Sequence, residues 1–318
     1  MTYYATPADY PHDIGPTAVV IGVLDGVHLG HRSLLGLAHA HAHAARVVAL
    51  TFDPHPGAVL GHGAPPMLLP LEARLRRLHT AGADDVVLLP FDSARAAQDP
   101  SEFIREVLVS DLHASVVVVG EAFRFGRRAA GDVAMLKQVG EPLGFKTFPA
   151  ATVTVDGATV SSTRIRTAVA DGETDVAAAL LGAPHRVYGA VVRGDQRGRQ
   201  LGYPTANVAV ESGIALPGDG VYAGWLVLEP DAHGEQHLPA AISVGPNLTF
   251  DGVETRVEAY VLDALDLDLY DQHVAVEFGS RLRPMVKFES VDDLLAAMAA
   301  DVASARLATA DRRAWLVP

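Results

Sequence analysis

The stretch "TAVVIGVLDGVHLGHRSLL" (residues 17–35) decides the fold of the first half of the chain. Its first part, residues 17–23, is mostly apolar and predicts a buried strand. Residues 31–45 are rich in alanine and leucine and predict a helix. His28 and His31 lie in the connection between them, with Gly30 in the same turn. The stretch therefore predicts a strand, a polar loop and a helix in succession.

The same pattern continues through the first half of the chain. Further apolar strands are predicted at 46–52, 85–91 and 114–120. Helices are predicted between and after them at 71–82, 100–112 and 131–144. Short apolar strands separated by helices are typical of a parallel, doubly wound α/β sheet. We therefore expect an N-terminal α/β domain built on such a sheet.

The second half has a different pattern. It begins with a helix predicted over 162–182. Strands with turn residues between them follow at 185–194, 220–229, 239–245, 255–263 and 273–283, and a closing helix at 290–310. This pattern predicts an antiparallel barrel or sandwich. A glycine and a proline near residues 182–185 mark the boundary, so we expect domains at 1–183 and 184–318.

Composition excludes several classes of function. The 318 residues include no cysteine, which excludes disulfides, zinc–thiolate sites and cysteine nucleophiles. The net charge of −13 argues against nonspecific nucleic-acid binding and against anionic membranes as partners. No signal peptide and no stretch long enough to span a bilayer is found, so a cytoplasmic location is expected. The sequence does not indicate an oligomeric state.

The polar loops of the first half are suited to binding phosphate. A helix N-terminus after a strand offers N–H groups to an anion, and His28 and His31 can donate hydrogen bonds to phosphate oxygens. The alternatives are a tight turn with incidental histidines or, less favoured, a metal-binding pair. Three more segments fall at the same predicted edge: "TFDPHP" (51–56), "GEAFRFGRRAAGD" (120–132) and "SSTRIR" (161–166). Taken singly, they could be a rigid loop, a basic loop and a helix cap.

Two segments of the second half carry candidate chemistry. "RGDQRGRQLGYPTANV" (193–208) is rich in glycine and arginine and ends on Thr205 and Asn207. Their oxygens suit Mg²⁺ and the glycine N–H groups suit phosphate, whereas the alternative is a basic hairpin loop. Glu258 lies among apolar residues in "VEAY" (257–260) and could act as a general base. The alternative is an exposed strand face on which Arg256 pairs with it.

Taken together, these motifs resemble the prokaryotic bifunctional riboflavin kinase/FAD synthetase family over nearly the whole chain. The resemblance also covers "GVYAGW" (220–225), "AISVGPNLTF" (241–250) and "DLYDQHVAVEF" (268–278). It implies a nucleotidyltransferase-like Rossmann domain and a six-stranded riboflavin kinase barrel with a closing helix. The barrel would phosphorylate riboflavin to FMN with ATP, and the first domain would adenylylate FMN to FAD and release pyrophosphate. Riboflavin, FMN and ATP would be the substrates, with Mg²⁺ as cofactor.

The resemblance also implies roles for individual residues. The catalytic residues would be Glu258, His28 and His31. ATP and its phosphates would be bound by Gly22, Asp25, Gly26, Gly30, Ser162, Thr163, Arg164, Arg166, Gly198, Arg199, Gly202, Thr205 and Asn207. The flavin would be bound by Asp53, Pro54, His55, Phe123, Phe125 and Gly126. Thr205 and Asn207 would hold the metal.

The sequence departs from the family pattern at three places. The family usually has Phe at the position of Leu24 and Asn or Asp at that of Ala122, and residues 246–249 are P-N-L-T instead of T-N-P-T. These departures leave an alternative open, a diverged relative with one live module or with altered flavin specificity. A flavin-binding protein without activity is disfavoured, because the phosphate motifs are retained.

Overall fold

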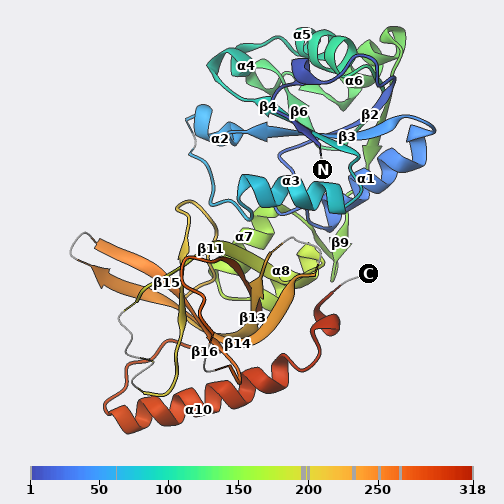
Figure 1. Cartoon of the computed structure of the whole chain (residues 1–318). Helices are drawn as coiled ribbons and strands as arrows, with labels where there is room; N and C mark the ends of the chain where they lie inside the picture. The colour runs from blue at the N-terminus through green and yellow to red at the C-terminus, as the bar shows by residue number, and fades with distance from the viewer. Residues whose placement is uncertain are drawn as a thin grey trace. The chain divides into compact units, whose positions relative to one another are not determined.

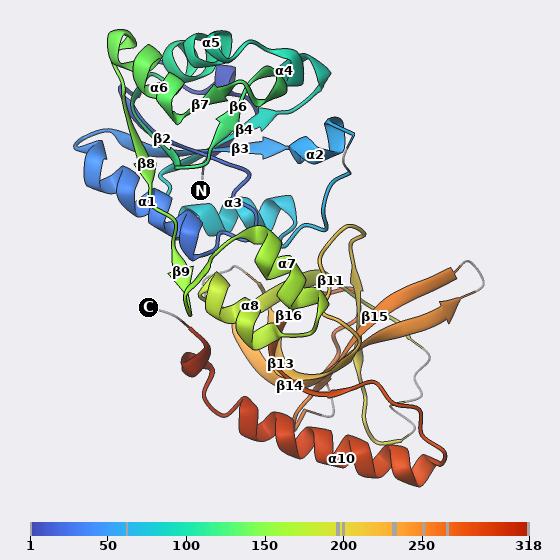
Figure 2. The same ribbon diagram turned by 180° about the vertical axis from the view of Figure 1, so that it is seen from behind.

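A computed structural model shows that the protein consists of two compact units (Figure 1; Figure 2). The structure describes residues 2–61, 63–194, 198, 201–230, 234–249, 252–264 and 267–316. Unit 1 comprises Met1–Pro65 and Leu71–Val160, and unit 2 comprises Pro66–Pro70 and Ser161–Pro318. Among the described residues, no helix is long and apolar enough to cross a membrane.

Unit 1 is built on a six-stranded sheet in which every neighbouring pair of strands is parallel. In spatial order its strands are β1 (Tyr3–Tyr4), β4 (Asp85–Pro90), β3 (Arg46–Asp53), β2 (Thr17–Ile21), β5 (Ala114–Gly120) and β8 (Lys146–Ala150). All five residues of β2 are buried, as the apolar run predicts. The doubly wound sheet is therefore confirmed, and β1 and β8 are strands that the apolar pattern did not predict.

Helices cover both faces of this sheet (Figure 1). One face carries α1 (Leu29–Ala42) and α3 (Leu71–Thr80), and the other carries α4 (Ser93–Ala97), α5 (Pro100–Phe103) and α6 (Val133–Gly140). The helix predicted over 100–112 continues beyond α5 as a π-helix, η2 (Ile104–Asp111), which buries Ile104, Val107 and Leu108. The shorter elements are η1 (Pro7–Asp9), α2 (Pro56–Val59), β6 (Arg124–Phe125), η3 (Arg127–Ala129), β7 (Gly131–Asp132), η4 (Glu141–Leu143), β9 (Thr154–Val155) and β10 (Ala158–Thr159).

The order of the strands locates a crevice in unit 1. From β2 the chain goes outward through β3 and β4 on one side, and through β5 and β8 on the other. The strand order therefore reverses between β2 and β5. Ligands of open α/β sheets bind outside the carboxyl ends of the strands at such a point.

Unit 2 is a closed six-stranded barrel, confirming the prediction for the second half. Its strands, in order around the barrel, are β11 (His185–Val192), β12 (Ala206–Val210), β15 (Gly252–Val261), β14 (Gln236–Thr249), β13 (Gly220–Leu228) and β16 (His273–Pro284). Helix α10 (Val291–Ala308) packs Ala305 against Ala223 and Leu262 of the barrel. The short helix η5 (Arg312–Trp315) follows it.

The prediction of a single helix over 162–182 is wrong. The segment forms two helices, α7 (Ser162–Ala170) and α8 (Thr174–Leu181). Gly172 between them has φ +76°, a left-handed conformation that interrupts a right-handed helix. A Cβ at Gly172 would also lie 2.7 Å from the Tyr222 hydroxyl oxygen, so only glycine fits there.

A buried ionic cluster connects the barrel to the C-terminal segment. Arg186 Nη2 lies 2.6 Å from Glu277 Oε1, and Arg312 Nε donates to Glu277 Oε2 at 2.9 Å. His237 contacts both Glu235 and Glu277, at 3.1 and 3.3 Å. Burial raises the pKa of Glu277, but the bonds from His237 and Arg312 outweigh it and hold that pKa well below its usual range. The same two carboxylates raise the pKa of His237.

Candidate active sites

Two adjoining cavities lie at the carboxyl edge of the unit 1 sheet. The aromatic cavity, about 610 Å³, is lined by Phe52, Phe91, Phe103, Phe123 and Phe125 together with Arg95, Arg124 and Arg128. The histidine cavity, about 290 Å³, is lined by His28, Gly30 and His31 and by segments that follow β5 and β8. Gly22, Ala122 and Phe123 line both cavities. The two cavities thus meet at the reversal of strand order.

The local geometry explains the H-x-G-H spacing. His28 is the N-cap of α1, and its Nδ1 accepts a hydrogen bond from the His31 N–H at 3.3 Å. The His28 and His31 rings stack with their centroids 3.6 Å apart. A Cβ at Gly30 would lie 3.1 Å from the His28 ring, so the small residue lets the capping ring rest on the first turn. The motif is a helix cap that also brings two imidazoles to the cavity.

Electrostatics keep His31 neutral. Its pKa is lowered well below 6.5, first by burial and then by the nearby His28 and Arg74. Its buried Nδ1 has no hydrogen-bond partner among the described residues. A neutral ring with an unpaired nitrogen can bind a substrate oxygen or a water. The described residues contain no group of three or more metal-ligating side chains, here or elsewhere.

Not every residue predicted in unit 1 lines a cavity. Phe123, Phe125 and Gly126 line the aromatic cavity, and Gly22 lines both cavities. Asp25, in the loop between β2 and α1, is buried with 1% of its surface exposed, and Gly26 beside it has φ +83°. The segment 53–55, which begins with the last residue of β3, lines neither of these cavities. There, His55 Nδ1 accepts the Gly57 N–H at 3.0 Å and caps α2.

The "SSTRIR" segment forms the start of α7 in unit 2. Ser161 caps this helix by accepting the Arg164 N–H at 3.2 Å, so neither Ser162 nor Thr163 is the cap. Arg166 Nε donates to the Pro66 carbonyl at 2.7 Å within the same unit. The hydroxyls of Ser162 and Thr163 therefore belong to the first turn of the helix.

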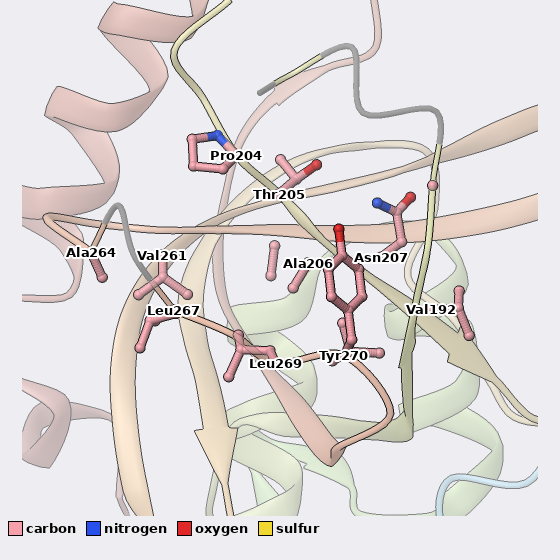
Figure 3. A pocket seen from close by; sticks show the side chains of 13 residues that line it. Val192, Pro204, Thr205, Ala206, Asn207, Val261, Ala264, Leu267, Leu269 and Tyr270 are labelled. Atoms are coloured by element: carbon pink, nitrogen blue, oxygen red, sulfur yellow. The ribbon is translucent and has the colours of Figure 1, made fainter. Parts of the chain in front are cut away.

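Two of the cavities of unit 2 adjoin each other at Thr205. The smaller, about 70 Å³, is lined by Gly194, Thr205, Asn207 and Tyr270 over an apolar floor (Figure 3). Figure 3 shows the polar ends of Thr205, Asn207 and Tyr270 on one side of the cavity, with Val261, Leu267 and Leu269 on the other. The larger, about 270 Å³, lies between barrel and α10 and is lined by Glu258, Tyr203 and Tyr260 among others. Thr205 lines both cavities.

Strand register brings the candidate base to the candidate metal ligand. Asn207 of β12 lies directly opposite Glu258 of β15, and Glu258 is also opposite Ser243 of β14. Val257 and Ala259, the neighbours of Glu258, are 1% and 0% exposed and point into the barrel core. Glu258 therefore faces away from the core and into the larger cavity.

Asn207 has the properties of a ligand-binding amide. Its Oδ1 is buried and accepts no hydrogen bond from any described residue. A Cβ at Gly194 would lie 2.5 Å from Asn207 Nδ2, so glycine there makes room for the amide. The Tyr203 N–H donates to the Gly198 carbonyl at 2.8 Å and closes a turn. A Cβ at Gly198 would lie 2.4 Å from the Tyr203 carbonyl oxygen. Gly202 has φ +85°, and Arg199 lies outside the described residues.

The cavities also include residues that sequence reasoning missed. Phe52 and Phe91 lie near the ends of β3 and β4 and line the aromatic cavity. An aromatic residue at the end of a parallel strand could have indicated them as candidate binding residues. Asp301 of α10 and Arg283 of β16 line the larger unit 2 cavity as a forked pair, with Nη2–Oδ2 at 2.8 Å. The sequence gives no signal for that pair, because it joins a helix to a strand.

The departures from the family pattern fall at informative places. Ala122 lies where the two unit 1 cavities meet, and Leu24 lines the histidine cavity with 1% of its surface exposed. The small Ala122 leaves the junction open. The side chains of residues 247–249 in the P-N-L-T segment lie outside the described residues.

The fold and the sites define a class, an α/β nucleotidyltransferase-like unit joined to a flavokinase-like barrel. The FAD synthetase family model matches residues 11–164, and the riboflavin kinase family model matches residues 181–309. A bifunctional riboflavin kinase/FMN adenylyltransferase from Escherichia coli K12 is 36% identical over 291 residues, covering 91% of each chain. The namesake from Haemophilus influenzae is 34% identical and covers 91% of this chain and 93% of its own.

A solved structure is similar over the whole length. It is a chain from Streptococcus pneumoniae described as a macrolide-efflux protein, 33% identical, with a TM-score of 0.86. It covers 96% of this chain and 98% of its own. The chain belongs to the bifunctional riboflavin kinase/FMN adenylyltransferase family. Both enzyme domains are present, so nothing in these comparisons supports the alternative of a single live module.

Proposed function

We propose that unit 1 transfers the adenylyl group of ATP to FMN where its two cavities meet. The observation that carries this proposal is the shared lining of Gly22, Ala122 and Phe123. The aromatic cavity suits a flat flavin ring, and the histidine cavity suits a triphosphate beside the N-terminus of α1. At their junction an FMN phosphate could approach the α-phosphorus of ATP.

The chemistry needs orientation and charge stabilisation rather than a covalent intermediate. An FMN phosphate oxygen forms a bond to the α-phosphorus of ATP, the bond to the β-phosphate bridging oxygen breaks, and pyrophosphate leaves. Because the Nδ1 of His28 accepts the His31 N–H, the N–H of the His28 ring is at Nε2, which we propose donates to a phosphate oxygen. His31 is proposed as the second partner of the triphosphate.

Further nucleotide and flavin contacts remain part of this proposal. For ATP they are Gly22, Asp25, Gly26, Gly30, Ser162, Thr163, Arg164 and Arg166. For the flavin they are Asp53, Pro54, His55, Phe123, Phe125 and Gly126. The burial of Asp25 favours a role in shaping the loop.

We propose that unit 2 phosphorylates riboflavin between Glu258 and Thr205. The larger cavity, with Tyr203 and Tyr260 in its lining, would take the flavin, and the smaller would take the end of ATP. The riboflavin 5′-hydroxyl oxygen bonds to the γ-phosphorus, its proton passes to the Glu258 carboxylate, and ADP leaves. Gly198, Arg199 and Gly202 are proposed to hold the phosphates.

A Mg²⁺ ion fits the donors at this site. The unpaired Oδ1 of Asn207 and the hydroxyl of Thr205 are oxygen ligands of the kind that Mg²⁺ prefers. When bound, the ion would neutralise charge on the phosphates of ATP. The residues themselves orient the nucleotide toward Glu258.

We propose functional domains at 1–183 and 184–318, which assigns α7 and α8 to the adenylyltransferase domain although they belong to compact unit 2. The FAD synthetase match ends at residue 164, and the riboflavin kinase match begins at residue 181, three residues before the proposed start of the second domain. Use of ATP, an intracellular metabolite, supports a cytoplasmic location.

An assay of flavin products tests both proposals. With riboflavin, ATP and Mg²⁺, the protein should form FMN and then FAD. Glu258→Gln should form no FMN from riboflavin but should still form FAD from added FMN, and the exposed Glu289→Gln serves as the matched control. FMN accumulation without FAD by the unaltered protein would contradict the unit 1 proposal. Loss of both reactions in a folded Glu258→Gln variant would contradict the separation of the sites.

A further inference from the structure

Arg74 is a buried cation that bridges two strand ends in unit 1. It lies on α3 with 2% of its surface exposed. Nη1 donates to the Val23 carbonyl at 3.2 Å, and Nη2 donates to the Phe52 carbonyl at 3.0 Å. Val23 follows β2 and Phe52 lies near the end of β3. One guanidinium fork therefore holds together the two segments that begin the candidate active site.

The loop after β2 has a backbone that needs such support. Three of its residues have positive φ: Leu24 at 54°, Gly26 at 83° and Val27 at 44°. The left-handed region is unfavourable for leucine and especially for β-branched valine, so surrounding contacts must hold these residues there. The Val23 carbonyl, next to Leu24, accepts from Arg74 and also from the Thr51 hydroxyl at 2.7 Å. Arg74 is thus half of a clamp at the start of the strained loop.

The clamp lies within electrostatic reach of the catalytic candidates. Burial lowers the pKa of Arg74, and the carboxylates of Asp25 and Asp53 partly offset that effect. Arg74 in turn is one of the groups that lower the pKa of His31. Its Nε has no partner among the described residues, whereas Nη1 and Nη2 donate to the two carbonyls. A buried guanidinium that donates to the Val23 carbonyl of the loop and to the Phe52 carbonyl of β3 indicates that the mutual position of these two segments matters.

We propose that Arg74 is a positioning residue for adenylyl transfer, fixing the loop that carries His28 and His31 against the end of β3. It acts through the backbone and is not placed in contact with substrate. The inference rests on the proposed location of adenylyl transfer at this sheet edge. It predicts that loss of the fork lowers turnover, because the histidines lose their alignment with the α-phosphate.

The test compares Arg74→Met, Arg74→Lys and the control Arg77→Met from the same helix, using the full-length protein. In Arg74→Met, kcat for FAD formation from FMN should fall about 100-fold, with a smaller change in the KM for ATP. Arg74→Lys should recover part of the loss, because an ammonium can still donate to one of the carbonyls. Riboflavin phosphorylation by the same molecules should be unchanged in all three. An unchanged kcat in Arg74→Met, or no recovery in Arg74→Lys, would overturn the inference.

A second measurement covers the case in which Arg74→Met does not fold. Thr51→Val removes the other donor to the Val23 carbonyl, and a double-mutant cycle with Arg74→Lys measures their coupling in kcat. Non-additive effects support the clamp, and additive effects overturn it. His31→Gln separates this inference from the proposed function. If that variant retains full adenylyl transfer, the location of the site is wrong; if only the Arg74 variants retain it, the clamp alone is wrong.

Discussion

The two candidate sites carry their side chains on different kinds of structural element. In unit 1, His28 and His31 lie on a loop and the first turn of a helix, beyond the end of a parallel strand. In unit 2, Asn207 and Glu258 lie on paired strands of a closed barrel, opposite each other by register. The first site depends on caps and on a buried clamp, whereas the second depends on hydrogen-bonded strand pairing. Perturbations of local geometry should therefore affect the two sites differently.

Two glycine substitutions test this difference with the largest expected effect. Gly194→Ala puts a Cβ 2.5 Å from the Asn207 amide, which is held on a barrel strand, so riboflavin phosphorylation should fall about 100-fold. Gly30→Ala puts a Cβ 3.1 Å from the His28 ring, which can shift slightly, so adenylyl transfer should fall only several-fold. Steady-state kinetics of both reactions on each variant measure the effects.

Gly36→Ala is the control for the substitution in α1, because a Cβ at Gly36 meets nothing within 4 Å. Alanine there should leave both activities intact and stabilise the helix by about 0.5–1 kcal/mol. A larger loss from Gly30→Ala than from Gly194→Ala would reverse the contrast between a yielding loop and a fixed strand.

Substitutions in the ion pairs of α10 should have an intermediate effect on the stability of unit 2 and on its kinase kinetics. Arg283 binds Asp301 through two nitrogens in a partly buried pair, whereas Arg306 and Asp263 form an exposed pair. Asp301→Asn should destabilise unit 2 by about 1–3 kcal/mol and raise the KM for riboflavin, because it loosens the helix that walls the larger cavity. Asp263→Asn should change neither, because exposed pairs contribute little.

Thermal unfolding followed by circular dichroism, together with kinase kinetics, distinguishes the two substitutions. Equal effects of Asp301→Asn and Asp263→Asn would mean that burial of the pair is not what fixes α10.

The smallest predicted effect is an opposite response of the two units to pH. The pKa of His31 in unit 1 is lowered below 6.5, so the unfolded chain binds more protons, and unit 1 should lose stability as pH falls through about 6.5. The pKa of His237 in unit 2 is raised, so its contribution is present below about 6.5 and is lost as pH rises through the higher native pKa. Hydrogen exchange resolved by peptide, between about pH 5 and 8 with correction for intrinsic rates, measures each unit separately. His31→Gln and His237→Gln should each abolish the response of its own unit, and a shared direction in both units would contradict the assignment.

The sequence predicted the parallel sheet and the barrel because both have strong apolar patterns. It missed β12, because Ala206–Val210 directly follows a glycine-rich loop that looks like a hairpin connection. That strand is what brings Asn207 opposite Glu258, so their relation was not predictable from spacing along the chain. Helical spacing predicted the helix that became α3. The same spacing does not distinguish the buried Arg74 from the more exposed Arg77 three residues later. The apolar pattern and the spacing of residues do not predict contacts between elements that are remote in sequence.

The central claim is that one chain holds two separate active sites, each sufficient for its own reaction. Mixing two inactive variants tests it most directly. Glu258→Gln and His31→Gln should each fail to make FAD from riboflavin and ATP, the first for lack of FMN and the second for lack of adenylyl transfer. An equal mixture should form FAD, because FMN released by the His31→Gln chain is adenylylated by the Glu258→Gln chain. FMN that accumulates in the mixture without conversion to FAD would contradict the claim.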